Sequence, residues 1–279
     1  MSMFFEGNLI GVMQGRLLPK YLGRYQAHPV GYWQEEFSKA QNIGLNCIEF
    51  ILDQNDIEQN PLMHQDGLNS IAEQVQQTGV KVVSVCADSF MQSPLHAGQD
   101  ADKANSISVL KQLLTAARQL SIKDIVIPCV DNSSLQAPKA YDSFVEVLLE
   151  LKTLAEAADI NLSLETDLAP APFAKLLSDC DSTNVTVNYD IGNSAALGYD
   201  FHDELAAYGE KITDLHVKDR ELGGGPVELG TGNADIPGFF QALQKFHYQG
   251  PIIMQAYRDD EGEAIFRQQL HWLQQILGG

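Results

Sequence analysis

The sequence predicts one α/β domain, a (β/α)₈ TIM barrel that spans residues 1–279. Short apolar runs alternate with longer amphipathic segments from one end of the chain to the other, and eight such runs can be counted. Several runs are nearly continuous hydrophobics rich in Val and Ile, which is typical of parallel strands buried on both faces. The length of 279 residues suits one such barrel, although length alone would also allow two domains.

The expected strands follow one another at intervals that leave room for a helix after each. In chain order they are LIGVM (9–13), CIEFIL (47–52), VKVVSVCA (80–87), DIVIPCV (124–130), INLSLET (160–166), VTVNYD (185–190), ITDLHVKD (212–219) and PIIMQAY (251–257). No GxGxxG pattern follows the first run, so the usual sign of a dinucleotide-binding sheet is missing. A doubly wound open sheet would also alternate, but with fewer units.

Helical periodicity fills the intervening segments. Apolar residues recur every three or four positions, and the first two helices end at Gly44 and Gly79, where a glycine is the expected stop. The expected helices cover 33–44, 68–79, 101–120, 141–158, 172–180, 201–209, 236–246 and 263–277. No linker or low-complexity tract divides the chain, which favours one domain.

Composition argues against several function classes. The formal net charge is −19, and a chain this acidic repels nucleic-acid phosphates and anionic membranes. No stretch approaches the roughly 20 apolar residues that would cross a bilayer, and the N-terminus lacks the features of a signal peptide. We therefore expect no nucleic-acid or membrane partner, a cytoplasmic location, and a homodimer as one oligomeric state.

The four cysteines form no CxxC pair, and three of them sit inside apolar runs. Free cysteines in such runs behave as small hydrophobes, so reduced core thiols are expected rather than disulfides. They are Cys47, Cys86, Cys129 and Cys180.

Polar residues gather where the later strands end, which is where active sites of such barrels lie. Glu165, Asp190 and His216 fall at or near the ends of three successive strands, and Gln255 lies on the eighth. Carboxylates and an imidazole beside an apolar core are costly unless they bind a cation, so we expect Mn²⁺, Mg²⁺, Co²⁺ or Zn²⁺ there, with Gln255 adding an amide oxygen. Each residue also has an ordinary explanation: an Asp after a strand is often a helix cap, and a lone His is often a core residue.

Positive charge is scarce but concentrated. Arg16, Lys218, Arg220 and Arg258 all follow strands that would be neighbours around a closed barrel, and a glycine-rich loop (223–233) lies beside them. Phosphate sites in this fold often use loops near the seventh and eighth strands, which predicts contacts with an anionic, phosphorylated substrate. Charge balance for nearby acidic residues is the alternative.

Several segments together resemble a known superfamily. GVMQGR, CIEF, SVCAD, NYDIGNSAALGYD, LHVKDR and ELGTGNADIPGFFQAL are similar to the xylose-isomerase-like sugar phosphate isomerase/epimerase superfamily, over nearly the whole chain. The resemblance implies an isomerase or epimerase of carbohydrate metabolism, related to pentulose-phosphate 3-epimerases and hexulose-phosphate isomerases. It also implies that Glu165, Asp190 and His216 are metal ligands and that Glu165 is the catalytic acid/base.

One position departs from that pattern. The epimerases have a second glutamate on the eighth strand where this chain has Gln255, which cannot move a proton near neutral pH. Isomerisation needs only one base, whereas epimerisation normally needs two. Glu49 and Asp88, which we also expect to contact substrate, could fill the second role, as could Cys86 and His96.

Three other functions stay open at this point. A keto-inositol dehydratase could use the same ligands, and a sugar-binding protein without turnover would fit the loss of the second glutamate. An AP endonuclease is disfavoured because it needs several metal ions and a basic surface, whereas this chain has seven histidines in total and is strongly acidic.

Overall fold

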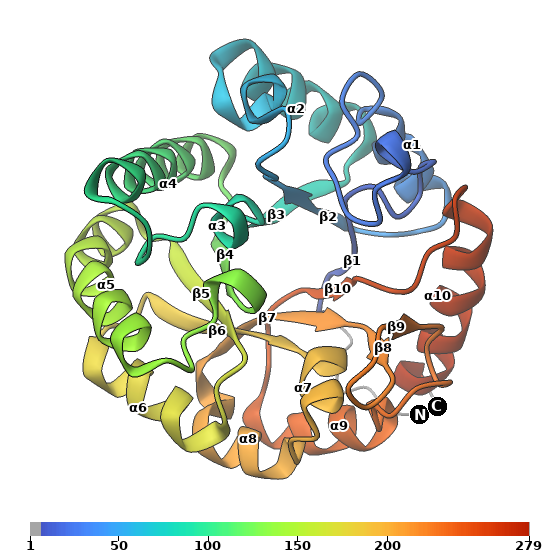
Figure 1. Cartoon of the computed structure of the whole chain (residues 1–279). Coiled ribbons are helices and arrows are strands. Elements are labelled where there is room, and N and C mark those ends of the chain that lie inside the picture. Colours follow the sequence, from blue (N-terminus) through green and yellow to red (C-terminus); the bar gives the residue numbers. More distant parts are fainter. Residues whose placement is uncertain (1–6, 279) are drawn as a thin grey trace.

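A computed structural model of the chain describes residues 7–278 as a closed barrel of eight parallel strands surrounded by helices (Figure 1). The strand order around the barrel is β1-β10-β7-β6-β5-β4-β3-β2. The barrel strands are β1 (Ile10–Met13), β2 (Cys47–Ile51), β3 (Lys81–Cys86), β4 (Asp124–Cys129), β5 (Asn161–Thr166), β6 (Val185–Asp190), β7 (Ile212–Val217) and β10 (Ile252–Met254). The predicted TIM barrel is confirmed; residues 1–6 and 279 of the predicted domain lie outside the described residues.

Helices separate successive strands and form the outer ring seen in Figure 1. Pro138 occupies the first turn of α5, where its missing N–H costs nothing, and Gly79 ends α2 in a left-handed conformation. The α-helices are α1 (Glu35–Asn42), α2 (Gln65–Thr78), α3 (Ser89–Gln92), α4 (Asp100–Leu120), α5 (Pro138–Ala158), α6 (Pro170–Cys180), α7 (Ile191–Leu197), α8 (Phe201–Tyr208), α9 (Ile236–Leu243) and α10 (Glu263–Gly278). Short 3₁₀ turns lie at Tyr21–Gly23, Ile57–Gln59, Pro61–Met63, Asp131–Ser133, Gly209–Lys211 and Gln244–Phe246.

Two apolar cores stabilise this arrangement. The larger lies between the strands and the helices, and a smaller one fills the barrel interior with Met13, Cys47, Ile51, Cys86, Val126 and Ile253. Gly11 in β1 is needed there, because a Cβ atom would lie 2.5 Å from Cys47 Sγ. All four cysteines are buried and unpaired, which confirms the expectation of free thiols.

The last two predicted strands end earlier than expected. β10 stops at Met254, because the Gln255 N–H donates to Ile253 O instead of continuing the sheet. β7 stops at Val217, and Asp219–Arg220 form β8, which pairs with β9 (Pro226–Val227) in a small antiparallel ribbon. These two breaks turn the polar residues that follow toward the mouth of the barrel.

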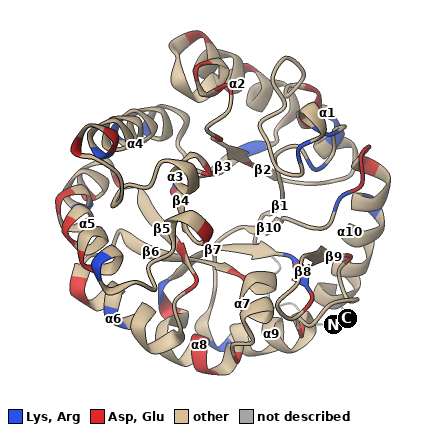
Figure 2. Cartoon of the chain, in the orientation of Figure 1, with Lys and Arg blue, Asp and Glu red and all other residues tan. Residues whose placement is uncertain are grey.

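Acidic residues are spread over the outer helices, as Figure 2 shows. Within residues 7–278, no helix is both long enough and apolar enough to cross a membrane.

Candidate active site

A cavity of about 780 Å³ opens at the carboxyl ends of the barrel strands. Most of the residues that line it have polar or charged side chains. The ionisable side chains that line it are Arg16, Arg24, Tyr25, Asp53, Cys86, Asp88, Asp131, Glu165, Asp167, Lys218 and Arg220. The cavity is therefore large enough for a sugar and carries both signs of charge.

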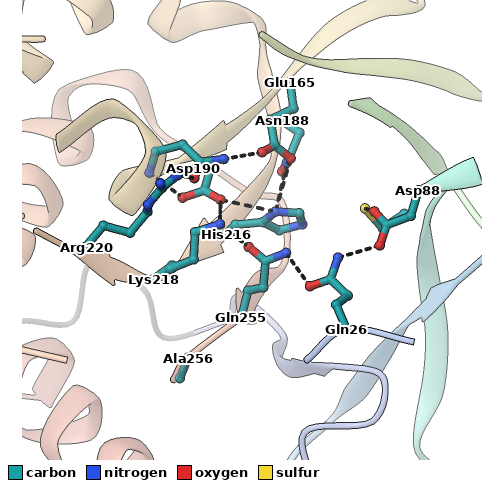
Figure 3. Close-up of polar contacts among 12 residues, drawn as sticks. Gln26, Asp88, Glu165, Asn188, Asp190, His216, Lys218, Arg220, Gln255 and Ala256 are labelled. Carbon is teal, nitrogen blue, oxygen red and sulfur yellow. Dashed lines mark hydrogen bonds and ion pairs between the residues drawn. The ribbon is translucent and has the colours of Figure 1, made fainter. Parts of the chain in front are cut away.

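Glu165, Asp190 and His216 converge beneath this cavity (Figure 3). β6 and β7 pair Asp190 directly with His216, and one ligand atom from each of the three residues lies within 4.8 Å of the others. His216 Nδ1 is 3.5 Å from Glu165 Oε2 and 4.0 Å from Asp190 Oδ2. Two ligands that each lie about 2.1 Å from one ion are separated by such distances, so these three residues fit a divalent cation.

The other side of His216 is held by a second buried carboxylate. Nε2 donates to Glu49 Oε1 at 2.7 Å, and Ser84 Oγ donates to Glu49 Oε2 at 2.5 Å. Ligating histidines are usually oriented by such a carboxylate. Burial lowers the pKa of His216, but the charges of Glu49 and Glu165 outweigh it and raise the pKa well above its ordinary value. Without a metal ion the imidazole is therefore protonated, and a bound metal ion would displace that proton.

Asp190 divides its two oxygens between two tasks. Oδ1 accepts the Asn193 N–H and caps α7, while Oδ2 lies 2.6 Å from Lys218 Nζ. Lys218 Nζ also donates to Gln255 Oε1 at 2.8 Å, so the amide oxygen expected to bind a metal faces an ammonium group. The helix cap and the candidate ligand are thus the same side chain, and Gln255 is bonded to Lys218 instead of the other three residues.

Two asparagines position Glu165, whose side chain reaches the cavity wall. Asn188 Nδ2 donates to Oε2 at 3.0 Å and Asn193 Nδ2 to Oε1 at 2.5 Å. Burial acts to raise the pKa of Glu165, but His216 and Lys218 outweigh it and lower the pKa. The carboxyl group is therefore ionised near neutral pH, as a base must be. Neither asparagine was predicted as a site residue from the sequence, although both flank Asp190 within the NYDIGN stretch.

The lysine and arginine side chains expected to contact substrate lie in different surroundings. Lys218 and Arg220 line the cavity, and Arg220 Nη1 donates to Asn193 Oδ1. Arg16 lines it too, but its guanidinium is bonded to Ala256 O, Tyr25 O and Gln26 Oε1.

Arg258 lies apart from the cavity wall and donates to backbone carbonyls of residues 15 and 18. Arg24, which the sequence did not single out, also lines the cavity, and its guanidinium forms ion pairs with Asp53 at 3.1 Å and Asp56 at 3.9 Å.

The glycine-rich loop binds the side-chain carboxylate of Asp219, a residue of the same chain. Backbone N–H groups of Gly230, Gly232 and Ala234 donate to the Asp219 carboxylate. A Cβ atom at residue 232 would lie 2.2 Å from Asp219 Oδ1, so glycine is required. The expectation that these amides meet a substrate anion is therefore corrected, because they are already used to hold the loop.

Of the four candidates for a second acid–base group, two line the cavity and two do not. Asp88 and Cys86 line the cavity. Glu49 is fully buried beneath His216 and does not line it, and His96 packs edge-on against Phe144.

The chain is similar to several known proteins. The chain is 27% identical to the L-ribulose-5-phosphate 3-epimerase UlaE of Salmonella paratyphi A over 85% of this chain and 87% of that protein. The IOLI protein with a bound zinc atom has a TM-score of 0.77 and 17% identity, and covers 97% of this chain and 98% of its own. A xylose isomerase-like protein from Mycobacterium smegmatis in complex with magnesium has a TM-score of 0.72 and 16% identity, and covers 99% and 98%.

A family model described as a xylose isomerase-like TIM barrel matches residues 37–276. The expected relation to sugar isomerases and epimerases is confirmed. The chain belongs to the xylose isomerase-like TIM barrel family.

Proposed function

We propose that this chain is a metal-dependent isomerase or epimerase of a small sugar, with Glu165 as the group that takes the proton. The convergence of Glu165, Asp190 and His216 on one position that fits a metal ion carries the proposal. Of these three residues only Glu165 also lines the cavity, so it is the one that can reach a substrate. Zinc and magnesium in two structural neighbours support a divalent metal held by these three residues.

The chemistry needs a carbonyl next to a carbon that bears both hydrogen and hydroxyl. A bound divalent metal would polarise that carbonyl and so acidify the neighbouring C–H group. Glu165 takes the proton from this carbon, and the electron pair of the C–H bond forms the enediolate. Asn188 and Asn193 hold the carboxylate in place throughout.

A sugar phosphate is the substrate class that we favour. The relative named above acts on a pentulose 5-phosphate by its name, and Lys218, Arg220 and Arg24 bring positive charge to the cavity wall. Arg24 is paired with Asp53 and Asp56 in this structure, so a phosphate would share its guanidinium with these two carboxylates. In the barrel order β1 lies opposite β5, so Arg24, which follows β1, would bind the end of the sugar distant from Glu165.

Hydrogen exchange tests the proposal directly. Purified protein with Mn²⁺ is incubated with L-ribulose 5-phosphate or L-ribulose in D₂O, and ¹H NMR follows loss of the carbon-bound proton next to the carbonyl. We expect exchange with the wild-type protein and a loss of at least about a hundredfold in Glu165→Gln, which removes the base.

Asp142→Asn is the matched control, since it removes an exposed carboxylate on α5, which does not line the cavity, and should keep the rate. Undiminished exchange in a folded Glu165→Gln variant would eliminate Glu165 as the base. Loss of a β-hydroxyl in the same spectra would instead identify a lyase, and absence of any exchange despite bound Mn²⁺ would favour a binding protein.

A further inference from the structure

Asp88 is a buried carboxylate on the cavity wall that the proposed proton transfer does not use. It lies two residues after the end of β3, and the residue is 7% exposed. Gln26 Nε2 donates to Oδ2 at 2.6 Å, and the Cys86 thiol donates to Oδ1 at 3.1 Å. Among residues 7–278 no lysine, arginine or histidine forms an ion pair with it. Neutral donors therefore orient Asp88 without neutralising it.

A chain of hydrogen bonds connects Asp88 to the candidate metal site, as Figure 3 shows. Lys218 can only donate, so Gln255 must present Oε1 to it and Nε2 to Gln26 Oε1 at 3.0 Å. Arg16 donates to the same oxygen of Gln26, which leaves the Gln26 amide nitrogen for Asp88. The orientation of every amide along this chain is thus determined.

Gln255 has a defined role in this arrangement. Its two polar atoms are both used, one on Lys218 and one on Gln26. The residue that stands where the epimerases have a glutamate therefore serves as a positioning residue, two hydrogen bonds away from a carboxylate.

Asp88 and Glu165 lie on separate parts of one cavity wall. Asp88 lies just after β3 and Glu165 lies near the end of β5; these strands are separated by β4 in the barrel, and both residues line the cavity. In Figure 3, Asp88 lies on the far side of Gln26 from the cluster around His216. A sugar in the cavity would be approached by two carboxyl groups from different strands.

We propose that Asp88 is the second acid–base group, which delivers a proton to the face of the enediolate opposite Glu165 and so makes the enzyme an epimerase. This assignment rests on the proposed function. Glu165 takes the proton from C3 of a 2-ketose, the C–H electron pair becomes the C2–C3 double bond, and the carbonyl oxygen gains the negative charge. The Asp88 carboxyl group then protonates C3, the C2 carbonyl re-forms, and C3 is inverted.

The surroundings of Asp88 suit an acid. Burial raises its pKa to about 6, although the bonds from Gln26 and Cys86 act to lower it, and the charges of Glu165 and Asp53 add to the rise. A protonated fraction is thus available near neutral pH. One turnover leaves Glu165 protonated and Asp88 ionised, which is the state required for the reverse reaction, and exchange with water restores the first state.

The test measures exchange and inversion separately. Wild type, Asp88→Asn and Asp142→Asn are each incubated with Mn²⁺ in D₂O, once with L-ribulose 5-phosphate and once with its C3 epimer, L-xylulose 5-phosphate. We expect Asp88→Asn to lose inversion by at least about a hundredfold while it still exchanges the C3 proton of one epimer only. Asp142→Asn, which changes an exposed residue of α5 outside the cavity lining, should both exchange and invert at the wild-type rate.

Each other outcome counts against the assignment. Normal inversion by Asp88→Asn, or an equal loss of exchange with both epimers, would show that Asp88 is not the second acid–base group. Mn²⁺ affinity and thermal unfolding check that the variant is folded, and Asp88→Glu, which keeps the acid, should recover part of the inversion. If the wild-type protein itself exchanges neither sugar, the proposed function fails and Asp88 loses its role with it.

Discussion

Replacing Glu49 with glutamine tests whether His216 is a metal ligand without touching the ligand itself. Glu49 is fully buried and accepts from His216 Nε2 and Ser84 Oγ. Glu49→Gln keeps the shape of the side chain but removes the negative charge that makes the imidazole a stronger donor. Changes to such a supporting carboxylate typically weaken metal binding by about 10- to 100-fold, or about 1.4 to 2.7 kcal/mol.

Fold stability should respond differently. Burial and the charge of Glu49 together raise the pKa of Asp214 well above its ordinary value, so Asp214 is protonated and does not repel Glu49. His216, whose pKa is also raised, forms a buried ion pair with Glu49 in the metal-free protein. Removing one partner of a buried pair should lower the free energy of unfolding of the metal-free protein by about 3 to 5 kcal/mol.

Isothermal titration of Mn²⁺ into the metal-free proteins measures the affinity, and denaturant unfolding measures the stability. Ser84→Ala is the control, since it removes a neutral donor to the same carboxylate and should change the Kd by less than about threefold. Titrations in buffers of different ionisation enthalpy should also detect the proton released when the metal replaces it on His216. A Kd for Glu49→Gln within twofold of wild type, in a folded protein, would refute the role of His216.

Two further predictions concern charge near the site. Lys218→Met should strengthen Mn²⁺ binding by roughly tenfold or more in the same titration, because the ammonium group that shares Asp190 and Gln255 would be gone; weaker binding would contradict this. Burial lowers the pKa of His28 to about 3, so the folded protein keeps this imidazole neutral. The resulting contribution to stability, at most about 5 kcal/mol, is fully present above pH 6.5 and is lost as the pH falls from 6.5 toward 3. His28→Asn, which can keep the bond to Gln14, should reduce the loss of stability between pH 8 and pH 5 in denaturant unfolding; an unchanged loss would contradict the assignment.

The sequence predicted the barrel well because its strands carry a strong local signal. Residues 185–190 were predicted as a strand and form β6 with the same bounds, since a buried parallel strand needs an apolar run. The strand expected at 251–257 was too long, because its end depends on a bond from the Gln255 N–H to Ile253 O. α3 and α7 were not predicted, as four and seven residues are too few to establish a period.

The candidate site could be predicted only in part, for a related reason. Glu165, Asp190 and His216 lie at the ends of adjacent strands, so sheet topology alone brings them together. The partners of Gln255 could not be foreseen, because Gln26 comes from a loop 229 residues away in sequence. The hydrogen-bond partners of Arg258 could not be predicted for the same reason, since its acceptors are carbonyls of the loop after β1.

The arginines at the junction of β1 and β10 have a consequence for how the enzyme is made. Arg16 reaches Ala256 O, and Arg258 reaches Gly15 O, so the loop that carries Gln26 and Arg24 is held by contacts across 240 and 243 residues. Contacts this distant in sequence form late in folding. During synthesis on the ribosome, the loop after β1 can form these contacts only after β10 has emerged, so the cavity cannot form before then. A chain interrupted before β10 would lack both arginine contacts and the strand that closes the barrel, so its cavity could not assemble.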